Sequence, residues 1–228
     1  MKSEKECFMK NRCKQLHCED EGGCLILYKL NYLFDNAVMP TNLRPYMALK
    51  VDIDGTDLNE FKRLSEIQNN IMNFVEDGKQ LYIYSSQCGC GKTSWAARLM
   101  QTFFNKIWLK TPLKCRGLFI DVPGFLLALK DNISNKNSYI THIKENIANC
   151  DLVIWDDISN KVGTEFEITH LLSMINSRIN NGKANIYTSN ISPDRLSEFL
   201  DVRLASRIAT ASEKIELRGG DKRGLKNE

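Results

Sequence analysis

Residues 86–93, Ser-Gln-Cys-Gly-Cys-Gly-Lys-Thr, have the residue types and spacing of a phosphate-binding loop. Gly89 and Gly91 permit backbone conformations in which neighbouring N–H groups point at one anion. Lys92 can reach the β- and γ-phosphates of a nucleotide, and the hydroxyl of Thr93 is a ligand for Mg²⁺. The segment therefore predicts a site for ATP and Mg²⁺, with contacts expected from Ser86, Gln87, Cys88, Gly89, Cys90, Gly91, Lys92, Thr93 and Ser94.

One residue of this loop departs from the pattern. Ser86 stands where such loops have their first glycine, whose usual role is to permit the turn out of the preceding strand. Because serine is small, we expect nucleotide binding to survive the replacement, at lower affinity. Cys88 and Cys90 are interpreted as small loop residues without chemistry of their own.

Two carboxylates end the apolar run Asp-Leu-Val-Ile-Trp-Asp-Asp, residues 151–157. Beside a phosphate loop, Asp156 would hold Mg²⁺ through water and Asp157 would polarise the attacking water, as nucleotide hydrolysis requires. Further along the chain, Asn190 follows the apolar run 184–190, and its amide can orient that water. An ordinary asparagine between a strand and a turn would look the same.

Arg203 and Arg207 lie four residues apart and therefore on one face of a helix. Taken alone, such a pair indicates a solvated helix face. Beside a nucleotide site, the stronger interpretation is that one arginine contacts the phosphates bound by a neighbouring subunit.

Four cysteines, Cys7, Cys13, Cys18 and Cys24, occur within the first 24 residues. In a chain without an export signal, four soft ligands in so short a segment predict a tetrahedral Zn²⁺ site, in which His17 could replace Cys18. The spacing is wider than in common zinc motifs. An iron-sulfur cluster and free thiols therefore stay open as alternatives.

The strands and helices that must position these residues can be read from the apolar pattern. Short apolar runs at 81–85, 117–122, 151–157 and 184–190 alternate with helical patterns, which predicts an α/β fold with a parallel sheet flanked by helices. Helices are expected over 25–38, over 58–80 with a stop at Gly78, and over 93–108. We place a boundary near residue 45, between a small cysteine-rich module (1–45) and the main domain (46–228).

Composition excludes several classes of protein. With 43% hydrophobic and 26% charged residues the chain is neither a disordered nor a membrane protein, and its N-terminus lacks the apolar segment of a signal peptide. A cytoplasmic location is expected. The net charge of +3 permits a nucleic-acid partner without indicating one. Aromatic and basic residues interleave over 93–110, but Trp95 and Phe103 have the spacing of a buried helix face, which is the preferred interpretation over stacking on single-stranded DNA.

In order and spacing these motifs resemble the AAA+ ATPases, and more narrowly the replicative-helicase loaders of the DnaC, DnaI and IstB type, over about residues 46–228. The resemblance implies that Lys92 and Thr93 form the Walker A motif and Asp156 and Asp157 the Walker B motif. It also implies that Asn190 is sensor 1, that Arg207, with Arg203 beside it, is the arginine finger, and that Arg223 of Gly-Gly-Asp-Lys-Arg is the sensor 2 arginine. No C-terminal helical lid is expected, as in these loaders.

The resemblance implies an ATP-dependent DNA replication protein that forms a homo-oligomer with ATP and loads a hexameric replicative helicase onto single-stranded DNA. Asp157 is one methylene shorter than the glutamate common in AAA+ proteins, so hydrolysis should be slow and serve as an assembly switch. The zinc module would dock on the helicase, and a phage or mobile element is the expected source. The alternatives are an IstB-like transposition-accessory ATPase and a zinc-dependent nucleic-acid-binding adaptor with an inert ATP site.

Overall fold

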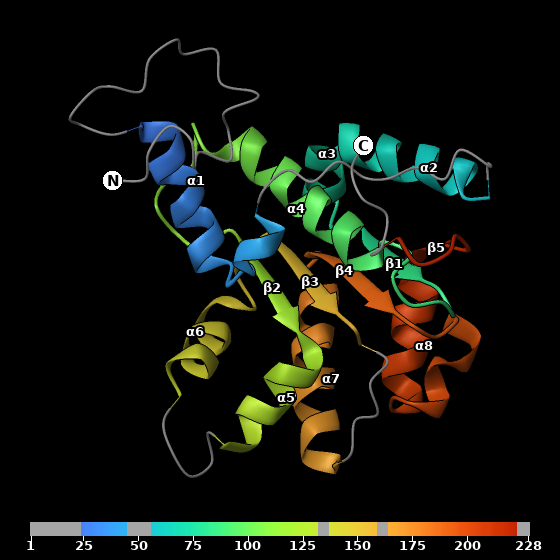
Figure 1. The fold of residues 1–228 in the computed structure, drawn as a ribbon. Coiled ribbons are helices and arrows are strands. Elements are labelled where there is room, and N and C mark those ends of the chain that lie inside the picture. The colour runs from blue at the N-terminus through green and yellow to red at the C-terminus, as the bar shows by residue number, and fades with distance from the viewer. Residues whose placement is uncertain (1–23, 45–55, 132–136, 159–163, 223–228) are drawn as a thin grey trace.

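In the computed structural model, residues 24–44, 56–131, 137–158 and 164–222 are described, and a five-stranded parallel sheet lies between two layers of helices (Figure 1). The strand order is β2-β3-β4-β1-β5. Strand β4 thus lies between β1, which precedes the phosphate loop, and β3, which ends at Asp156. The strands are β1 (Gln80–Tyr84), β2 (Gly117–Asp121), β3 (Leu152–Asp156), β4 (Ala184–Ser189) and β5 (Ser212–Glu216).

Both faces of the sheet are buried, because successive side chains of a strand point to opposite faces. In β3, Leu152 and Ile154 belong to one hydrophobic cluster, whereas Val153 and Trp155 belong to the other. This is why the central strands appear in the sequence as continuous apolar runs.

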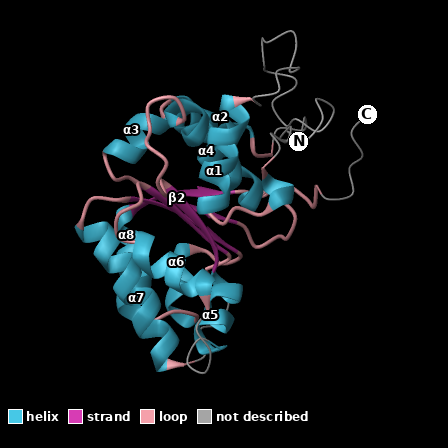
Figure 2. Cartoon of the chain, turned by 90° about the vertical axis from the view of Figure 1, so that its left-hand side faces the viewer, coloured by secondary structure: helices cyan, strands magenta, loops and turns pink. Residues whose placement is uncertain are grey.

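Helices cover the sheet in two layers (Figure 2). On the face of Leu152 and Ile154 lie α1 (Leu25–Asn36), α2 (Leu58–Asn69), α3 (Ile71–Glu76) and α4 (Lys92–Ile107). On the other face lie α5 (Val122–Asp131), α6 (Ser138–Asn146), α7 (Glu165–Asn180) and α8 (Val202–Ala211). Two short 3₁₀ helices, η2 (Thr41–Leu43) and η3 (Pro193–Glu198), complete the elements. No helix within the described ranges is long and apolar enough to cross a membrane.

The α/β fold and the four strands expected from the apolar runs are confirmed, and the structure adds the fifth strand, β5. The helix expected over 58–80 is divided at Asn70, whose φ of −103° and ψ of 26° are not helical. Two asparagines, Asn69 and Asn70, stand at the break, and asparagine is a poor helix former. The expected stop at Gly78 is confirmed by its left-handed φ of 62°.

Helix α1 packs on the main core. Leu30, Leu33 and Phe34 share a cluster with α4, and the rings of Phe34 and Phe104 are 5.6 Å apart. The backbone N–H of Phe119 in β2 donates to the carbonyl of Ala37 just after α1, at 2.8 Å. Among the described residues, therefore, no break in the core falls at residue 45. The separate module expected over 1–45 stays a prediction, and residues 1–23 of it lie outside the described ranges.

A buried arginine forms hydrogen bonds at the end of the sheet that lies opposite the phosphate loop. Arg178 of α7 is 0% exposed and donates to the carbonyl of Ile147 at 2.6 Å, to the carbonyl of Ala184 at 2.7 Å and to Oδ1 of Asn185 at 2.7 Å. Asn185 in turn donates to Oε1 of Gln80 in β1 at 2.8 Å. The charged side chain can be buried because its hydrogen bonds are made inside the protein. It connects α7 with the residue after α6 and with β4, and through Asn185 with β1.

Candidate functional site

The phosphate loop lies between β1 and α4, and two of its glycines have backbone conformations that other residues rarely adopt. The φ angle is 75° at Gly89 and 103° at Gly91. Gly91 precedes the first residue of α4 and no side chain caps that helix, so the N–H groups of its first turn are open to a ligand. Apart from the residues adjacent to Gly91 in the chain, no atom lies within 4 Å of the position that a Cβ on Gly91 would take. The loop thus offers N–H donors and open space, as an anion such as a phosphate requires.

Ser86 is compatible with this loop because its position needs no glycine. Among the described residues that carry a side chain, only Val38 and Asp157 have a positive φ. The turn after β1 is held instead by Ser85, whose Oγ accepts the N–H of Gln87 at 3.0 Å and whose N–H donates to the carbonyl of Ser189 at 3.2 Å. The sequence did not single out Ser85.

Lys92 lies against its own loop and is 9% exposed. Its ammonium donates to the carbonyl of Gln87 at 3.0 Å and to Sγ of Cys90 at 3.7 Å. Cys90 is buried whereas Cys88 is exposed, and neither forms a disulfide. The lysine is thus held within the loop that would surround the phosphates.

Asp156 at the end of β3 accepts two hydroxyl donors on one oxygen. Thr93 Oγ1 donates to Oδ1 at 2.9 Å, and Thr188 Oγ1 of β4 donates to the same oxygen at 2.6 Å. Burial raises the pKa of Asp156, the two hydroxyl bonds lower it, and the charges of Asp157 and Asp121 raise it again. The net direction is upward, because burial outweighs the hydrogen bonds. Asp121 ends β2 in register with Asp156, a proximity that the sequence analysis missed.

Asp157 and Asn190 lie together, and their assignment as a pair that positions water stays a prediction. Nδ2 of Asn190 donates to Oδ1 of Asp157 at 3.1 Å. Asp157 has a left-handed φ of 56°, and its N–H donates to Oγ1 of Thr188 at 2.9 Å. Thr188 therefore connects the carboxylate of Asp156 with the backbone of Asp157, which follows from the position of β4 next to β3. Its role could have been inferred only from the strand order, since Thr188 is an ordinary strand residue in the sequence.

Taken together, these residues fit ATP and Mg²⁺. The uncapped start of α4 and the open space at Gly91 suit phosphate oxygens. Thr93 and Asp156 bring a hydroxyl and a carboxylate oxygen to 2.9 Å of each other, and oxygen ligands of this kind are those that Mg²⁺ prefers. When bound, Mg²⁺ would neutralise charge on the phosphates.

The predicted arginines lie apart from this cluster. Arg203 and Arg207 are exposed on α8, where Arg203 pairs with Asp201 at 3.2 Å and Arg207 donates to Asn180 at 3.4 Å. Their assignment as arginine fingers stays a prediction. Arg223 lies outside the described residues, so its assignment as sensor 2 is untested.

The expected zinc site also stays a prediction. Cys7, Cys13, His17 and Cys18 lie outside the described residues. Cys24 is described, and its Sγ accepts the N–H of Leu27 at 3.4 Å and so caps the start of α1. In the part of the chain that the structure describes, no group of three potential metal-binding side chains occurs.

The aromatic residues of α4 are core residues. Trp95 is 4% exposed and Phe103 is 1% exposed, and both belong to the cluster between α4 and the sheet. The preferred interpretation of this pattern is therefore confirmed. Buried rings cannot stack on bases without rearrangement of the core.

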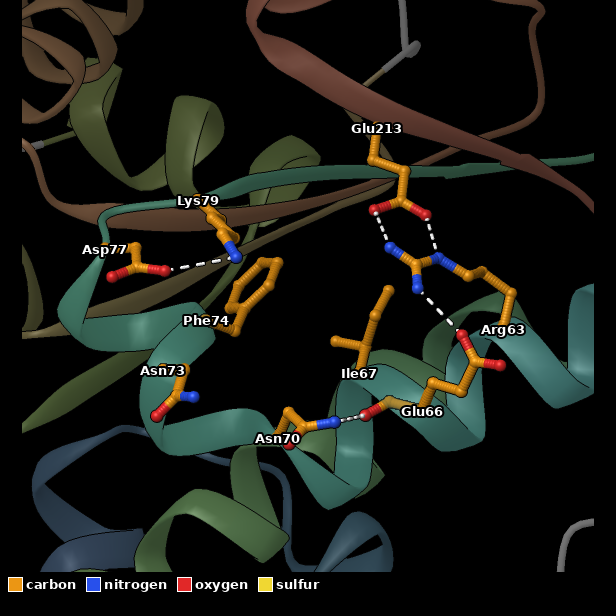
Figure 3. A pocket seen from close by; sticks show the side chains of 9 residues that line it. All are labelled: Arg63, Glu66, Ile67, Asn70, Asn73, Phe74, Asp77, Lys79 and Glu213. Atoms are coloured by element: carbon orange, nitrogen blue, oxygen red, sulfur yellow. Dashed lines mark hydrogen bonds and ion pairs between the residues drawn. The ribbon is translucent and has the colours of Figure 1, made fainter.

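A separate pocket of about 330 Å³ lies between α2, α3 and the start of β5, at the end of the sheet opposite the phosphate loop (Figure 3). Its charged side chains pair with each other. Arg63 pairs with Glu213 and Glu66, and Lys79 pairs with Asp77 at 3.1 Å. Since these charges are mutually satisfied, the pocket does not resemble a site for a charged ligand. Its lining consists of Arg63, Glu66, Ile67, Asn70, Asn73, Phe74, Asp77, Lys79 and Glu213.

Comparison with known proteins places these features in a family. Residues 59–212 match the sequence model of the family described as the bacterial DnaA ATPase domain. The match includes the phosphate loop, both carboxylates, Asn190, Arg203 and Arg207. A chromosomal replication initiator protein DnaA from Mycoplasma genitalium is 29% identical over 178 residues, which are 78% of this chain and 35% of that protein. The chain thus spans about a third of the length of this curated relative.

Two solved structures show the same fold. The crystal structure of the DnaC helicase loader has a TM-score of 0.60 and 18% identity, and the match covers 75% of this chain and 94% of that one. The replication initiator DnaA bound to AMPPCP and single-stranded DNA has a TM-score of 0.58 and 18% identity, and the match covers 74% of this chain and 48% of that one. The expected AAA+ core is thereby confirmed. An origin in a phage or mobile element finds no support in these comparisons.

Proposed function

Because the chain belongs to the family of the bacterial DnaA ATPase domain, we propose that it is an ATP-dependent DNA replication protein that loads a hexameric replicative helicase onto single-stranded DNA. The observation that carries the proposal is the cluster in which Thr93 and Thr188 hold Asp156 while Asn190 holds Asp157. This cluster adjoins a phosphate loop with open N–H donors. Such an arrangement binds a nucleotide and can distinguish ATP from ADP by the γ-phosphate.

Hydrolysis at this site is proposed to be slow. Asp157 would polarise the attacking water, and Asn190, which donates to its carboxylate, would help to orient that water. Aspartate is one methylene shorter than glutamate, so the water would be held less closely. A slow reaction suits a protein that changes its partners once for each ATP consumed.

Loading of a helicase is proposed by analogy with the DnaC helicase loader, whose fold this chain shares over 94% of that chain. Binding of single-stranded DNA is proposed by analogy with the DnaA complex.

Assembly with ATP is supported by the exposed arginines of α8. Arg203 and Arg207 project from one face of α8, where they are accessible to a neighbouring copy. We propose that Arg207 contacts the phosphates bound by the adjoining subunit and that Arg203 supports Arg207. Arg223 would contact phosphate within the same subunit.

The N-terminal cysteines are proposed to hold zinc in a module that docks on the helicase. Four thiolates can supply a tetrahedral site, and a short segment gains its folding energy from such a metal. Cys24 would then join the zinc module directly to α1, because it also caps that helix. Measuring zinc in the purified protein, against a Cys7→Ser and Cys13→Ser double variant, tests this part by itself.

Light scattering during size-exclusion chromatography tests the proposed function. The protein is mixed with the replicative helicase of the same organism in the presence of ATP, of ADP or of no nucleotide, and Lys92→Ala serves as the nucleotide-free variant. We expect a complex whose stoichiometry depends on ATP and is lost in Lys92→Ala. If no complex forms in any state, helicase loading is wrong, and a transposition accessory or an adaptor with an inert ATP site takes its place.

A further inference from the structure

Asp57, the residue before α2, is a buried carboxylate that is hydrogen-bonded to the segment after β5. It is 6% exposed. Oδ1 accepts the N–H of Arg218 at 2.7 Å, and Oδ2 accepts the N–H of Gly219 at 2.8 Å. The ammonium of Lys222 lies 3.9 Å from Oδ2. Both carboxylate oxygens are therefore used to hold residues 218–222, which we call the C-terminal strap.

The C-terminal strap also contacts the phosphate loop. The N–H of Lys222 donates to the carbonyl of Gly89 at 3.0 Å. In a trans peptide the carbonyl and the following N–H point in opposite directions. The bond from Lys222 therefore fixes the peptide between Gly89 and Cys90 and turns the N–H of Cys90 away from the strap.

Close packing at two glycines shows how tightly the strap is seated. A Cβ on Gly89 would lie 1.9 Å from Oδ1 of Asp221, and a Cβ on Gly219 would lie 2.6 Å from Oδ2 of Asp57. A side chain at Gly219 would have to displace the buried carboxylate of Asp57, and one at Gly89 would have to displace the side chain of Asp221. The strap thus contacts Asp57 at one end and the phosphate loop at the other.

Asp57 stands at the start of a helix that is itself fixed. Phe61 of α2 packs edge-on against Trp95 in the first turn of α4, with ring centroids 4.9 Å apart. Arg63 forms two hydrogen bonds to Glu213 of β5, from Nε at 2.5 Å and from Nη2 at 2.9 Å (Figure 3). Helix α2 is therefore connected both to the helix after the phosphate loop and to the strand before the strap.

We propose that Asp57 is a positioning residue for nucleotide binding. By holding the C-terminal strap it keeps the peptide between Gly89 and Cys90 in one orientation, and this preorganises the N–H donors of the phosphate loop. Asparagine would not substitute, because one of its two side-chain atoms is an NH₂ group, which would face an N–H donor. The proposal rests on the proposed function only in that the phosphate loop binds a nucleotide.

The test measures the affinity for a fluorescent ATP analogue with Mg²⁺ in four variants: Asp57→Asn, Gly219→Ala, the double variant, and Glu76→Gln as the matched control. Glu76→Gln makes the same charge change on an exposed residue at the end of α3. We expect Asp57→Asn and Gly219→Ala each to weaken binding on the order of tenfold, about the effect of one hydrogen bond to a charged group. Because both release the same strap, the double variant should be little weaker than either single variant.

Hydrogen exchange supplies the local measurement. Amides of residues 217–222 should exchange faster in Asp57→Asn, whereas those of β4 should not, which separates release of the strap from general unfolding. Gly219→Ala retains the carboxylate, so it tests the proposal even if Asp57→Asn does not fold.

The possible outcomes separate the two proposals. If the wild type binds nucleotide and Lys92→Ala does not, but Asp57→Asn and Gly219→Ala bind as tightly as the wild type or more tightly, the role of Asp57 is wrong and nucleotide binding stands. If the losses of affinity in the two single variants add up in the double variant, the proposed role of Asp57 is also wrong. If the wild type binds no nucleotide, the proposed function fails with it.

Discussion

Replacing Thr188 by valine removes a hydroxyl that connects the carboxylate of Asp156 with the backbone N–H of Asp157. Thr188 is 1% exposed, donates to Asp156 at 2.6 Å and accepts from the N–H of Asp157 at 2.9 Å. Valine has nearly the same shape, so the change removes the two hydrogen bonds without opening a cavity. Both Oδ1 of Asp156 and the N–H of Asp157 lose a partner.

The expected loss of stability follows from the two bonds. A hydrogen bond to a charged group contributes about 1.5–3 kcal/mol and a neutral one about 1 kcal/mol, so Thr188→Val should lower the free energy of unfolding by roughly 3 kcal/mol. For a chain of this length each kcal/mol corresponds to roughly 2–4 °C, which predicts a melting temperature roughly 6–12 °C lower. The hydroxyl stabilises ionised Asp156, whose pKa burial already raises. The loss should therefore be larger at high pH, where Asp156 is ionised, than at low pH, where it is protonated.

Thermal and urea unfolding with and without Mg²⁺-ATP measure this prediction. Thr188→Ser restores the hydroxyl and should recover most of the stability. Thr141→Val, which removes an exposed hydroxyl bonded to Asn137, is the matched control and should stay near the wild type. If Thr188→Val is as stable as the wild type, or if its loss does not depend on pH, the hydroxyl does not stabilise an ionised Asp156.

Three further changes test other parts of the structure. Arg178→Ala should lower the free energy of unfolding by more than about 3 kcal/mol, measured in urea, because it removes a buried charged donor from several acceptors at once; a cost below about 1 kcal/mol would contradict the network. Burial raises the pKa of Glu167, but bonds from Lys130 and Thr164 outweigh it and hold the pKa below its usual value. The contribution of Glu167 to the free energy of unfolding is thus present above the ordinary pKa and is lost as the pH falls through the lowered pKa. Glu167→Gln should therefore lower the free energy of unfolding by about 1 kcal/mol at pH 7 and by less below about pH 4. A loss of stability that does not change with pH would refute the assignment. Asn190→Ala removes an exposed bond to Asp157, so phosphate release should fall about tenfold while the melting temperature stays close to that of the wild type; unchanged phosphate release would exclude Asn190 from catalysis.

Local signals in the sequence were sufficient for the phosphate loop and for four of the five strands of the sheet. Central strands are buried on both faces, so their apolar runs are recognisable without knowledge of their neighbours. Strand β5 was missed because it is an edge strand whose residues, Ser-Glu-Lys-Ile-Glu, are mostly polar. Only its pairing with β1 identifies it as a strand.

Residues whose roles depend on distant partners were not predictable. Arg178 appears in the sequence as a solvated residue of an amphipathic helix, yet it is fully buried. Asp57 lies in a stretch of mixed polar residues that indicates a loop, and its partners are more than 160 residues away in the sequence. Asp156 and Asp157 were predicted because a known motif specifies them. Thr188 was not predicted, because it is not part of that motif.

The position of β4 between β1 and β3 has a consequence for how the protein acquires its site during synthesis. Strands β1 and β3 flank a gap that β4 fills, and Gln80 of β1 contacts Asn185 of β4 across 105 residues of sequence. A nascent chain that has emerged only as far as β3 holds the phosphate loop and both carboxylates but lacks the strand that joins them. Pairings between such distant segments form slowly, and unpaired strand edges invite aggregation until they form. ATP should therefore stabilise the growing chain only after β4 has left the ribosome.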